Sequence, residues 1–215
     1  EKQFGCSLPR ASVVHNPVNV AYDARPEWPD QSVYRLACVA RLGLREKGQD
    51  LLIEVLSLDK WRSRNVEVTL VGRGEHEQSL KRLCAERALK RFYFTGRRDD
   101  IEAVWAAHHA LVLPSRSEGL PLTLIEAMLC GRVPVVTSVG GICELVEDSR
   151  TGFVAKAPTI ELFDEALERA WNERERWRDI GARAAERVRL VMPPDPVGVF
   201  VDELRRHLDD VCPEC

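Results

Sequence analysis

The residues with the clearest chemistry lie in one stretch, residues 109–131, which reads HALVLPSRSEGLPLTLIEAMLCG. Two carboxylates stand in it, Glu118 and Glu126, with seven residues between them. Carboxylates accept hydrogen bonds from hydroxyl groups such as those of a sugar. The loop around Glu118 leads into a helical pattern, and a helix start presents unpaired N–H groups and positive dipole charge that favour phosphate. The stretch therefore suits a ligand that carries both phosphate and sugar.

The elements that position these groups are a strand, a loop and a helix. An apolar run at 110–113 stops at Pro114, the polar loop 115–119 follows, and a helical pattern begins near Pro121. Proline is tolerated in the first turn of a helix because its missing N–H leaves no bond unmade there. Glu126 then falls on the helix, in an apolar surrounding (EAMLCG) that predicts burial, and a buried carboxylate needs a partner.

Two cations mark an earlier loop, ARLGLREKGQDLL. Arg41 stands at the end of an apolar strand, and Lys47-Gly48 stands just before a helical pattern. Cations that converge on such a corner can neutralise a diphosphate, Arg through a bidentate fork and Lys as a point charge. Arginine and lysine are also common surface residues, so the residue types alone leave an ordinary surface role open.

Glycines mark two further loops. In VGRGEHEQSL, Gly72 and Gly74 flank Arg73, which fits either a tight turn or a ligand contact. In FTGRRDD, Asp99 and Asp100 precede a helical pattern and are expected to cap it.

The wider pattern predicts an α/β fold with a doubly wound, Rossmann-like parallel sheet. Apolar runs alternate with helical patterns, and such strands pack with helices on both faces. Strands are expected at 33–40, 66–72, 92–95, 109–113, 133–137 and 152–155. Helices are expected near 48–60, 75–90, 99–107, 120–130, 141–147 and 160–190. Ligands bind such sheets at the carboxyl ends of the strands.

The chain divides into three parts on this reading. Residues 1–31 hold four prolines and read as a lead-in, with at most one short strand at 12–15. Residues 32–192 form the α/β domain. Residues 193–215 form a C-terminal helix and tail, with Val199, Phe200, Leu204 and Leu208 on one helical face at 196–210.

Composition excludes some classes of function. The net charge of −3 argues against a nucleic-acid partner, which needs a basic excess. The chain has no run of eighteen apolar residues and no secretory signal at its start, so we expect a soluble, cytoplasmic protein.

The seven cysteines are odd in number and mostly lie in apolar segments, as expected of reduced core thiols. Cys212 and Cys215 have metal or redox spacing, but no second pair completes a zinc site, and a frayed tail is the favoured interpretation. His108 and His109 are expected to be structural.

The stretch 114–126 resembles the donor-site motif of the retaining nucleotide-sugar glycosyltransferases of family 4, which have the two-domain GT-B fold. The motif stands here as Pro114-Ser115, Glu118-Gly119 and Glu126, followed by Gly131, Pro134 and Gly140-Gly141. The segment ASVVHNPVN resembles the passage between the two domains of that family. Its Pro17 departs from the usual Asn-Gly, so Asn16 is given no role.

The resemblance implies a role for each matching residue. Arg41 and Lys47 would bind the donor diphosphate and stabilise charge on the departing nucleotide. Glu118 would bond sugar hydroxyls and Glu126 ribose hydroxyls. Contacts to the phosphates and the base would come from Gly72, Gly96, Arg97, Gly119 and Leu120. Ser115 would bond either phosphate or loop backbone. No metal and no cofactor would be needed, and the chain lacks the Asp-x-Asp triplet of metal-dependent sugar transferases.

The resemblance covers residues 12–190, which is the donor-binding half of a GT-B enzyme. We therefore expect a domain that binds a UDP- or GDP-sugar and transfers little by itself. The acceptor, a glycan, lipid or small molecule, would bind a first domain that precedes residue 1, and the full-length protein would be able to associate with a membrane surface. Two alternatives stay open: a sugar-nucleotide epimerase or phosphorylase of related architecture, and a non-catalytic nucleotide-binding module.

Overall fold

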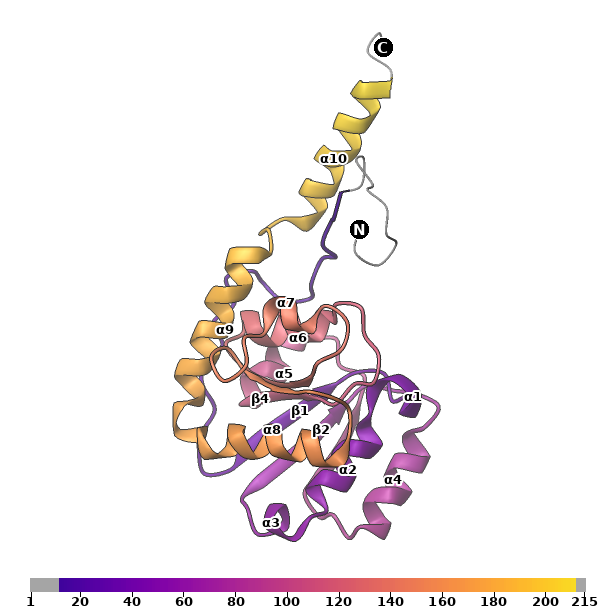
Figure 1. Ribbon diagram of the computed structural model, residues 1–215, viewed down its shortest axis with the longest axis vertical. Helices are drawn as coiled ribbons and strands as arrows, with labels where there is room; N and C mark the ends of the chain where they lie inside the picture. Colours follow the sequence, from indigo (N-terminus) through magenta and orange to yellow (C-terminus); the bar gives the residue numbers. More distant parts are fainter. Residues whose placement is uncertain (1–11, 212–215) are drawn as a thin grey trace. The chain divides into compact units, whose positions relative to one another are not determined.

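The computed structural model describes residues 12–211 (Figure 1). Residues 18–191 form one compact unit, which begins earlier than the boundary placed at residue 32 from the sequence. The described residues 12–17 and 192–211 belong to a second unit. Of the expected thiols, Cys6, Cys212 and Cys215 lie outside the described residues.

A six-stranded, wholly parallel sheet forms the centre of the compact unit. Its order is β3-β2-β1-β4-β5-β6, so the chain builds outward from β1 in one direction and then from β4 in the other. All six predicted strands are confirmed: β1 (Tyr34–Val39), β2 (Val66–Val71), β3 (Phe92–Gly96), β4 (Ala110–Leu113), β5 (Val133–Thr137) and β6 (Phe153–Ala155).

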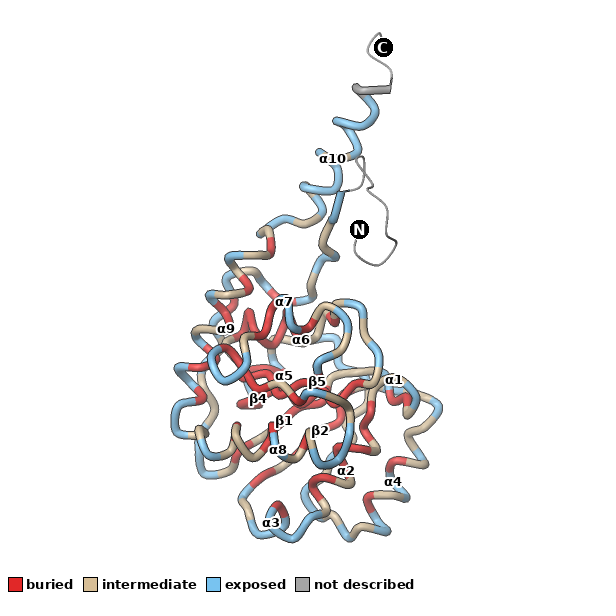
Figure 2. Tube along the Cα trace, viewed as in Figure 1, coloured by how far each residue is buried: buried red, intermediate tan, exposed pale blue. Residues whose placement is uncertain are grey.

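The two inner strands β4 and β5 are buried on both faces, as is typical of a parallel sheet. Every residue of β4 and β5 is buried, and these strands appear wholly red in Figure 2. Strands of this kind require helical cover on both sides, and the crossover helices supply it.

Helices cover the sheet in two layers (Figure 1). One layer holds α2 (Gln49–Leu56), α4 (Glu77–Glu86) and α8 (Ile160–Asn172). The other holds α5 (Ile101–Ala107), α6 (Leu122–Leu129) and α9 (Trp177–Val191). Three short helices complete the unit: α1 (Leu44–Lys47), α3 (Asp59–Arg62) and α7 (Ile142–Leu145).

Two predicted helices are wrong as single elements. The helix expected near 48–60 breaks where Leu58 takes an extended backbone, with ψ 142°. The helix expected at 160–190 ends at Asn172, passes through a 3₁₀ turn at Arg174–Arg176, and resumes at Trp177. Trp177 is buried and its indole N–H donates to the Ala170 carbonyl at 2.8 Å. This contact in the core fixes the turn between α8 and α9. Apolar spacing alone does not reveal such a change of direction.

Within the compact unit, the segment from Val18 to residue 31 is held by two arginines. Arg189 of α9 donates to the Tyr22 and Ala24 carbonyls at 3.0 and 3.1 Å. The buried Arg132 donates to the Glu27 carbonyl at 2.7 Å, and burial lowers the pKa of its guanidinium to about 10. The short strand expected at 12–15 does not form, because the described residues 12–17 have no regular secondary structure.

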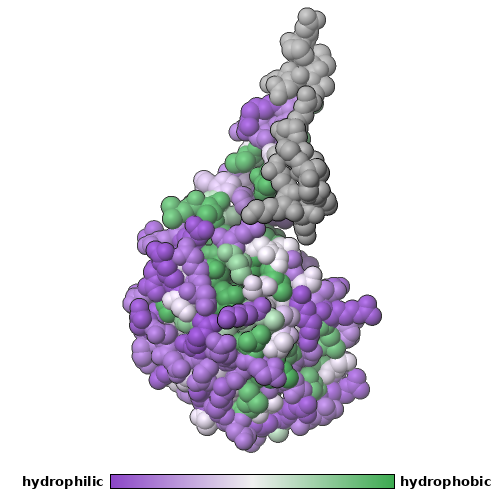
Figure 3. Space-filling view, viewed as in Figure 1, coloured by the Kyte–Doolittle hydropathy of each residue, from purple (hydrophilic) through white to green (hydrophobic). Residues whose placement is uncertain are grey.

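The predicted C-terminal helix is confirmed as α10 (Pro196–Val211). Its apolar residues Val199, Phe200, Leu204 and Leu208 are exposed. Within residues 12–211, no helix has the length and apolar character needed to cross a bilayer. On the face of the compact unit seen in Figure 3, hydrophilic residues predominate and the hydrophobic ones are scattered.

Candidate functional site

The loops that carry the predicted site residues converge because glycines let their backbones approach. Gly48 has φ +64°, and a Cβ there would lie 2.1 Å from the Pro114 carbonyl oxygen. Gly140 has φ +57°, and its Cβ would lie 2.2 Å from the carbonyl oxygen of Glu118. A side chain at either position would collide with backbone. The loops after β1, β4 and β5 are thus fixed against one another at the carboxyl edge of the sheet.

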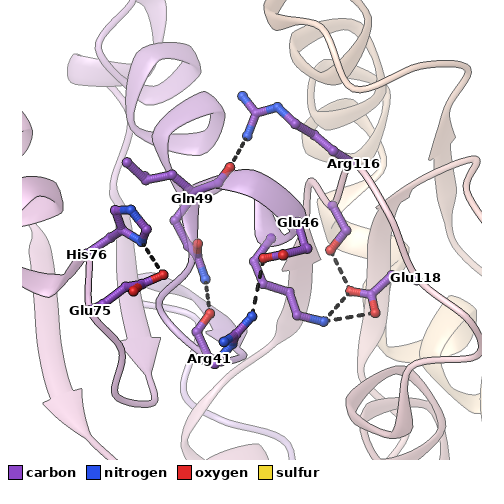
Figure 4. Close-up of polar contacts among 10 residues, drawn as sticks. Arg41, Glu46, Gln49, Glu75, His76, Arg116 and Glu118 are labelled. Atoms are coloured by element: carbon purple, nitrogen blue, oxygen red, sulfur yellow. Dashed lines mark hydrogen bonds and ion pairs between the residues drawn. The ribbon is translucent and has the colours of Figure 1, made fainter.

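Lys47 and Glu118 meet at this edge, and Figure 4 shows Glu118 with its polar contacts. The Lys47 ammonium lies 2.9 Å from both carboxylate oxygens of Glu118. The Ser115 hydroxyl donates to Glu118 Oε1 at 2.7 Å, so the carboxylate accepts three hydrogen bonds. The Lys47 side chain is 23% exposed and the Glu118 side chain is 7% exposed, so the lysine is the more accessible partner.

This pair stands where the strand order reverses. Lys47 belongs to the connection after β1, Glu118 to the connection after β4, and β1 and β4 are neighbours in the sheet. The two connections leave toward opposite faces there, and the gap between them is where open α/β sheets bind ligands. Residues distant in the sequence are therefore brought together at the predicted edge.

A second ion pair holds the two loops in place, and sequence reasoning missed it. The Arg116 guanidinium makes two 2.8 Å hydrogen bonds to the Asp50 carboxylate and a 2.7 Å bond to the Leu44 carbonyl. The backbone N–H of Arg116 also donates to the Glu46 carbonyl at 2.7 Å. The hydrogen bond to Asp50 raises the pKa of the Arg116 guanidinium. The position of Arg116 between Ser115 and Glu118 was the available signal.

Arg41 lies in the same region with its guanidinium accessible. Its side chain is 63% exposed and contacts Glu46 at 3.3 Å, while the buried Gln49 donates to its carbonyl at 2.9 Å. The backbone is thus fixed, and the charged end is exposed apart from its contact with Glu46.

Arg41 also lines a cleft of about 510 Å³ at the carboxyl ends of β1, β2 and β3. The cleft brings together the predicted Gly72 and Arg97 with Arg73 and Arg98. Gly72 has a structural reason of its own, because a Cβ there would lie 2.0 Å from the Ala40 carbonyl oxygen. Gly96 lies beside the cleft, with φ +67° and its carbonyl accepting from the Gly72 N–H at 2.9 Å.

Glu126 is buried on α6, as predicted, with a partner that sequence reasoning missed. Its Oε1 accepts from the backbone N–H of Asn19 at 3.0 Å and from the Asn19 side-chain amide at 2.8 Å. Only 3% of Glu126 is exposed, whereas Asn19 is exposed. Asn16, to which no role was given, belongs to the other compact unit. The position of Asn19 on the segment that enters the domain was the only sequence signal.

Gly119 and Leu120 precede the first turn of α6, with Pro121 as the capping residue. The Gly119 carbonyl accepts from the Gly141 N–H at 2.7 Å, which turns the loop toward the Gly140-Gly141 pair. The N–H groups of this loop therefore lie at the positive end of the α6 dipole, where an anion is favoured.

Other titratable groups near the site are structural. Cys38 is fully buried, and burial raises the pKa of its thiol to about 12, so it stays neutral. Asp100 caps α5, as predicted, by accepting from the Ala103 N–H at 2.9 Å. Among the described residues, no group of three His, Cys, Asp or Glu side chains is placed to hold a metal ion.

The sequence profile of the family described as "Glycosyl transferases group 1" matches residues 25–187. A glycogen synthase of Pseudomonas savastanoi pv. phaseolicola is 34% identical over 145 residues, which is 63% of this chain and 28% of that protein. The chain thus spans less than a third of the length of this relative.

Solved structures share the fold. The Anabaena protein HepE, in complex with UDP and glucose, has a TM-score of 0.72 at 23% identity, over 81% of this chain and 48% of that one. The C-terminal domain of the group 1 glycosyl transferase LpcC from Francisella tularensis has a TM-score of 0.68 at 17% identity, over 80% of this chain and 97% of that one.

Proposed function

Since the chain belongs to the group 1 glycosyl transferases, we propose that residues 18–191 bind the nucleotide-sugar donor of a retaining hexosyl transfer. One observation carries this proposal: Lys47, Ser115 and Glu118 form a hydrogen-bonded cluster at the point where the strand order reverses. A cation and a carboxylate side by side match the two halves of such a donor, the diphosphate and the sugar.

The phosphates would lie between the cations and the start of α6. Arg41 has an exposed guanidinium that is able to swing onto a diphosphate. Lys47 is held by Glu118, so its charge is already in position and little side-chain freedom is lost on binding. The N–H groups of Gly119 and Leu120 would add backbone donors.

The same groups would assist the transfer. As the bond from the sugar to the diphosphate breaks, negative charge grows on the departing nucleotide. Arg41 and Lys47 would stabilise that charge in place, so the binding groups would also act in the transition state. Glu118 would bond sugar hydroxyls and orient the ring. Attack on the face from which the diphosphate leaves would retain the configuration.

The nucleoside would lie in the cleft at the carboxyl ends of β1, β2 and β3. Arg41 is common to this cleft and to the phosphate region, so it would join the two. Gly96 and Arg97 would meet the base, and Glu126 would accept from the ribose hydroxyls. UDP is the first nucleotide to test because it is bound in the Anabaena structure of the same fold. The acceptor would bind a part of the protein outside this chain.

Calorimetric titration with UDP, GDP and ADP, each with and without magnesium, tests the proposal. We expect saturable binding of one nucleotide that is indifferent to metal and is weakened in Arg41→Ala. The matched control is Arg178→Ala, which removes an exposed arginine of α9. Absence of binding to all three nucleotides would contradict the proposal, and so would equal binding by Arg41→Ala and the parent.

A further inference from the structure

A separate cavity of about 580 Å³ opens at the amino ends of β2 and β3, where Val66 and Phe92 begin their strands. This is the edge of the sheet opposite the candidate donor site, and a strand of six residues spans roughly 20 Å between the edges. The volume falls in the range of small-molecule sites, about 300 to 1,000 Å³. The cavity is therefore large enough for a small ligand and distinct from the donor site.

The wall of this cavity is apolar and well ordered by packing. Trp61, Val66 and Val68 are 3%, 7% and 1% exposed and belong to the hydrophobic core. Leu89 and Phe92 complete the wall and pack against that core. An aromatic ring or a short alkyl chain would remove apolar surface from water here.

The rim of the cavity is cationic. Arg62, Arg64, Lys90 and Arg91 line it, and none of the described residues that line it is Asp or Glu. Positive charge gathers on one side of an apolar wall although the whole chain carries a net charge of −3. The rim thus differs from the average surface of the protein.

One of the four cations is neutralised by a carboxylate. Arg64 makes hydrogen bonds of 2.9 and 2.6 Å to Glu168 and stacks over the Trp61 ring at 4.2 Å. Its role is to hold the wall together.

The positive charge of the other three cations is available to a ligand. Arg62 donates to the Ser57 and Arg87 carbonyls at 2.6 and 2.7 Å, which fixes the guanidinium without neutralising it. Its ion pair with Asp59 is long, at 4.0 Å, and the Asp59 side chain is fully exposed, so solvent screens it. Arg91 contacts the amide oxygen of Asn65, and Lys90 is exposed on the rim. A fixed arginine loses little conformational entropy when an anion binds.

We propose that this cavity is a binding site for a small organic phosphate with an apolar ring or chain. The phosphate dianion would bind between Arg62, Lys90 and Arg91, which supply charge-assisted hydrogen bonds. The apolar body would lie against Trp61, Val68 and Phe92. Neither half of the ligand would bind tightly alone. Exposed cations bind free phosphate weakly, and an uncharged ring makes no charge-assisted contact with the rim.

Nuclear magnetic resonance of the full, ¹⁵N-labelled chain tests the proposal, with phenyl phosphate as the probe and saturating UDP present to occupy the donor site. We expect saturable shifts that centre on the amides of residues 61–66 and 88–92. Inorganic phosphate and benzyl alcohol, which each carry one half of the probe, are expected to bind at least tenfold more weakly. A repeat without UDP is expected to give the same shifts, so the test does not depend on the donor site.

Charge reversal at the rim completes the test. Both Lys90 and Arg91 are exposed, so Lys90→Glu combined with Arg91→Glu is expected to fold and to weaken phenyl phosphate at least tenfold. Lys90→Glu alone is expected to give an intermediate loss, and the matched control Arg178→Glu none. Unchanged binding by the double variant would overturn the proposal, and so would the absence of saturable shifts at this cavity.

Discussion

The ammonium of Lys47 lies 2.9 Å from both carboxylate oxygens of Glu118, although the two residues are 71 positions apart in the chain. The pair joins the connection after β1 to the connection after β4 across the point where the strand order reverses. Each residue neutralises the other. A nucleotide sugar would therefore meet a cation and a carboxylate that are already in position.

Lys47→Met should weaken UDP binding, because it removes a charge-assisted contact while keeping the length of the side chain. The expected loss is about 1.5–3 kcal/mol, measured by calorimetry. Glu118→Gln should keep UDP binding and lose the additional affinity of UDP-glucose over UDP. If Lys47→Met binds UDP as the parent does, Lys47 serves Glu118 only as a structural counter-ion.

Asn19→Ala should reduce the discrimination that the protein makes between UDP and 2′-deoxy-UDP. Asn19 holds Glu126 by two hydrogen bonds, and a carboxylate free to turn would present a poorer acceptor to the ribose. We expect the difference in binding free energy between the two nucleotides to shrink by about 1 kcal/mol. Asn16→Ala is the control. Equal weakening of both nucleotides by Asn19→Ala would show that Asn19 acts on folding alone.

Arg116→Ala should destabilise the loops that carry Lys47 and Glu118. Arg116 and Asp50 are each about one third exposed, so solvent screens the pair and the expected loss is only about 1 kcal/mol in unfolding free energy. The loss of UDP affinity should be larger than this change in stability, because the ends of both loops move. Urea unfolding and calorimetry on the same samples compare the two. Asp50→Asn, which keeps the shape of the partner, should fall between parent and Arg116→Ala.

The protein should lose stability as the pH falls from about 6.5 to 4, and His109 should cause part of that loss. His109 is fully buried between the rings of Trp28 and Tyr34. Burial, assisted by the positive charge of Arg35, lowers the pKa of the ring to about 4. Below pH 6.5 His109 is protonated in the unfolded chain, whereas in the folded chain it stays neutral until about pH 4. Stability therefore decreases as the pH falls across that window.

The expected contribution of His109 is roughly 2–3 kcal/mol between pH 7.5 and pH 4, at 1.36 kcal/mol for each unit of pKa difference. Urea unfolding of the parent and of His109→Gln at both pH values measures it. Burial also lowers the pKa of His108, so the variant should keep some dependence on pH. An identical dependence in both proteins would show that His109 does not contribute.

Ala88→Gly should stabilise the protein by roughly 0.5–1 kcal/mol. Ala88 has φ +53° just after α4, and the Ala88 and Leu89 N–H groups donate to the Ala85 and Cys84 carbonyls. This is a helix end at which glycine is favoured, because a Cβ strains the left-handed backbone. Ala85→Gly, in the helix itself and also exposed, should instead cost about 1 kcal/mol. Thermal unfolding of both variants tests the difference in sign.

The sequence was sufficient for the strands, their order along the chain and the residue types of the site. Apolar runs such as 110–113 and 133–137 have a local cause, since a strand buried on both faces must be apolar throughout. The loop at 115–119 could also be predicted, because a polar stretch between a strand and the start of a helix seldom forms anything other than a loop.

The partners of these residues were decided by the tertiary structure. The sequence pattern alone does not predict that Lys47 contacts Glu118, that Arg116 pairs with Asp50, or that Asn19 binds Glu126. Each contact joins residues far apart in the chain, and each depends on the strand order and on how closely the loops approach. Local sequence fixes the period and the polarity of an element. Which groups then lie within 3 Å of one another follows only from packing the whole sheet and its helices together.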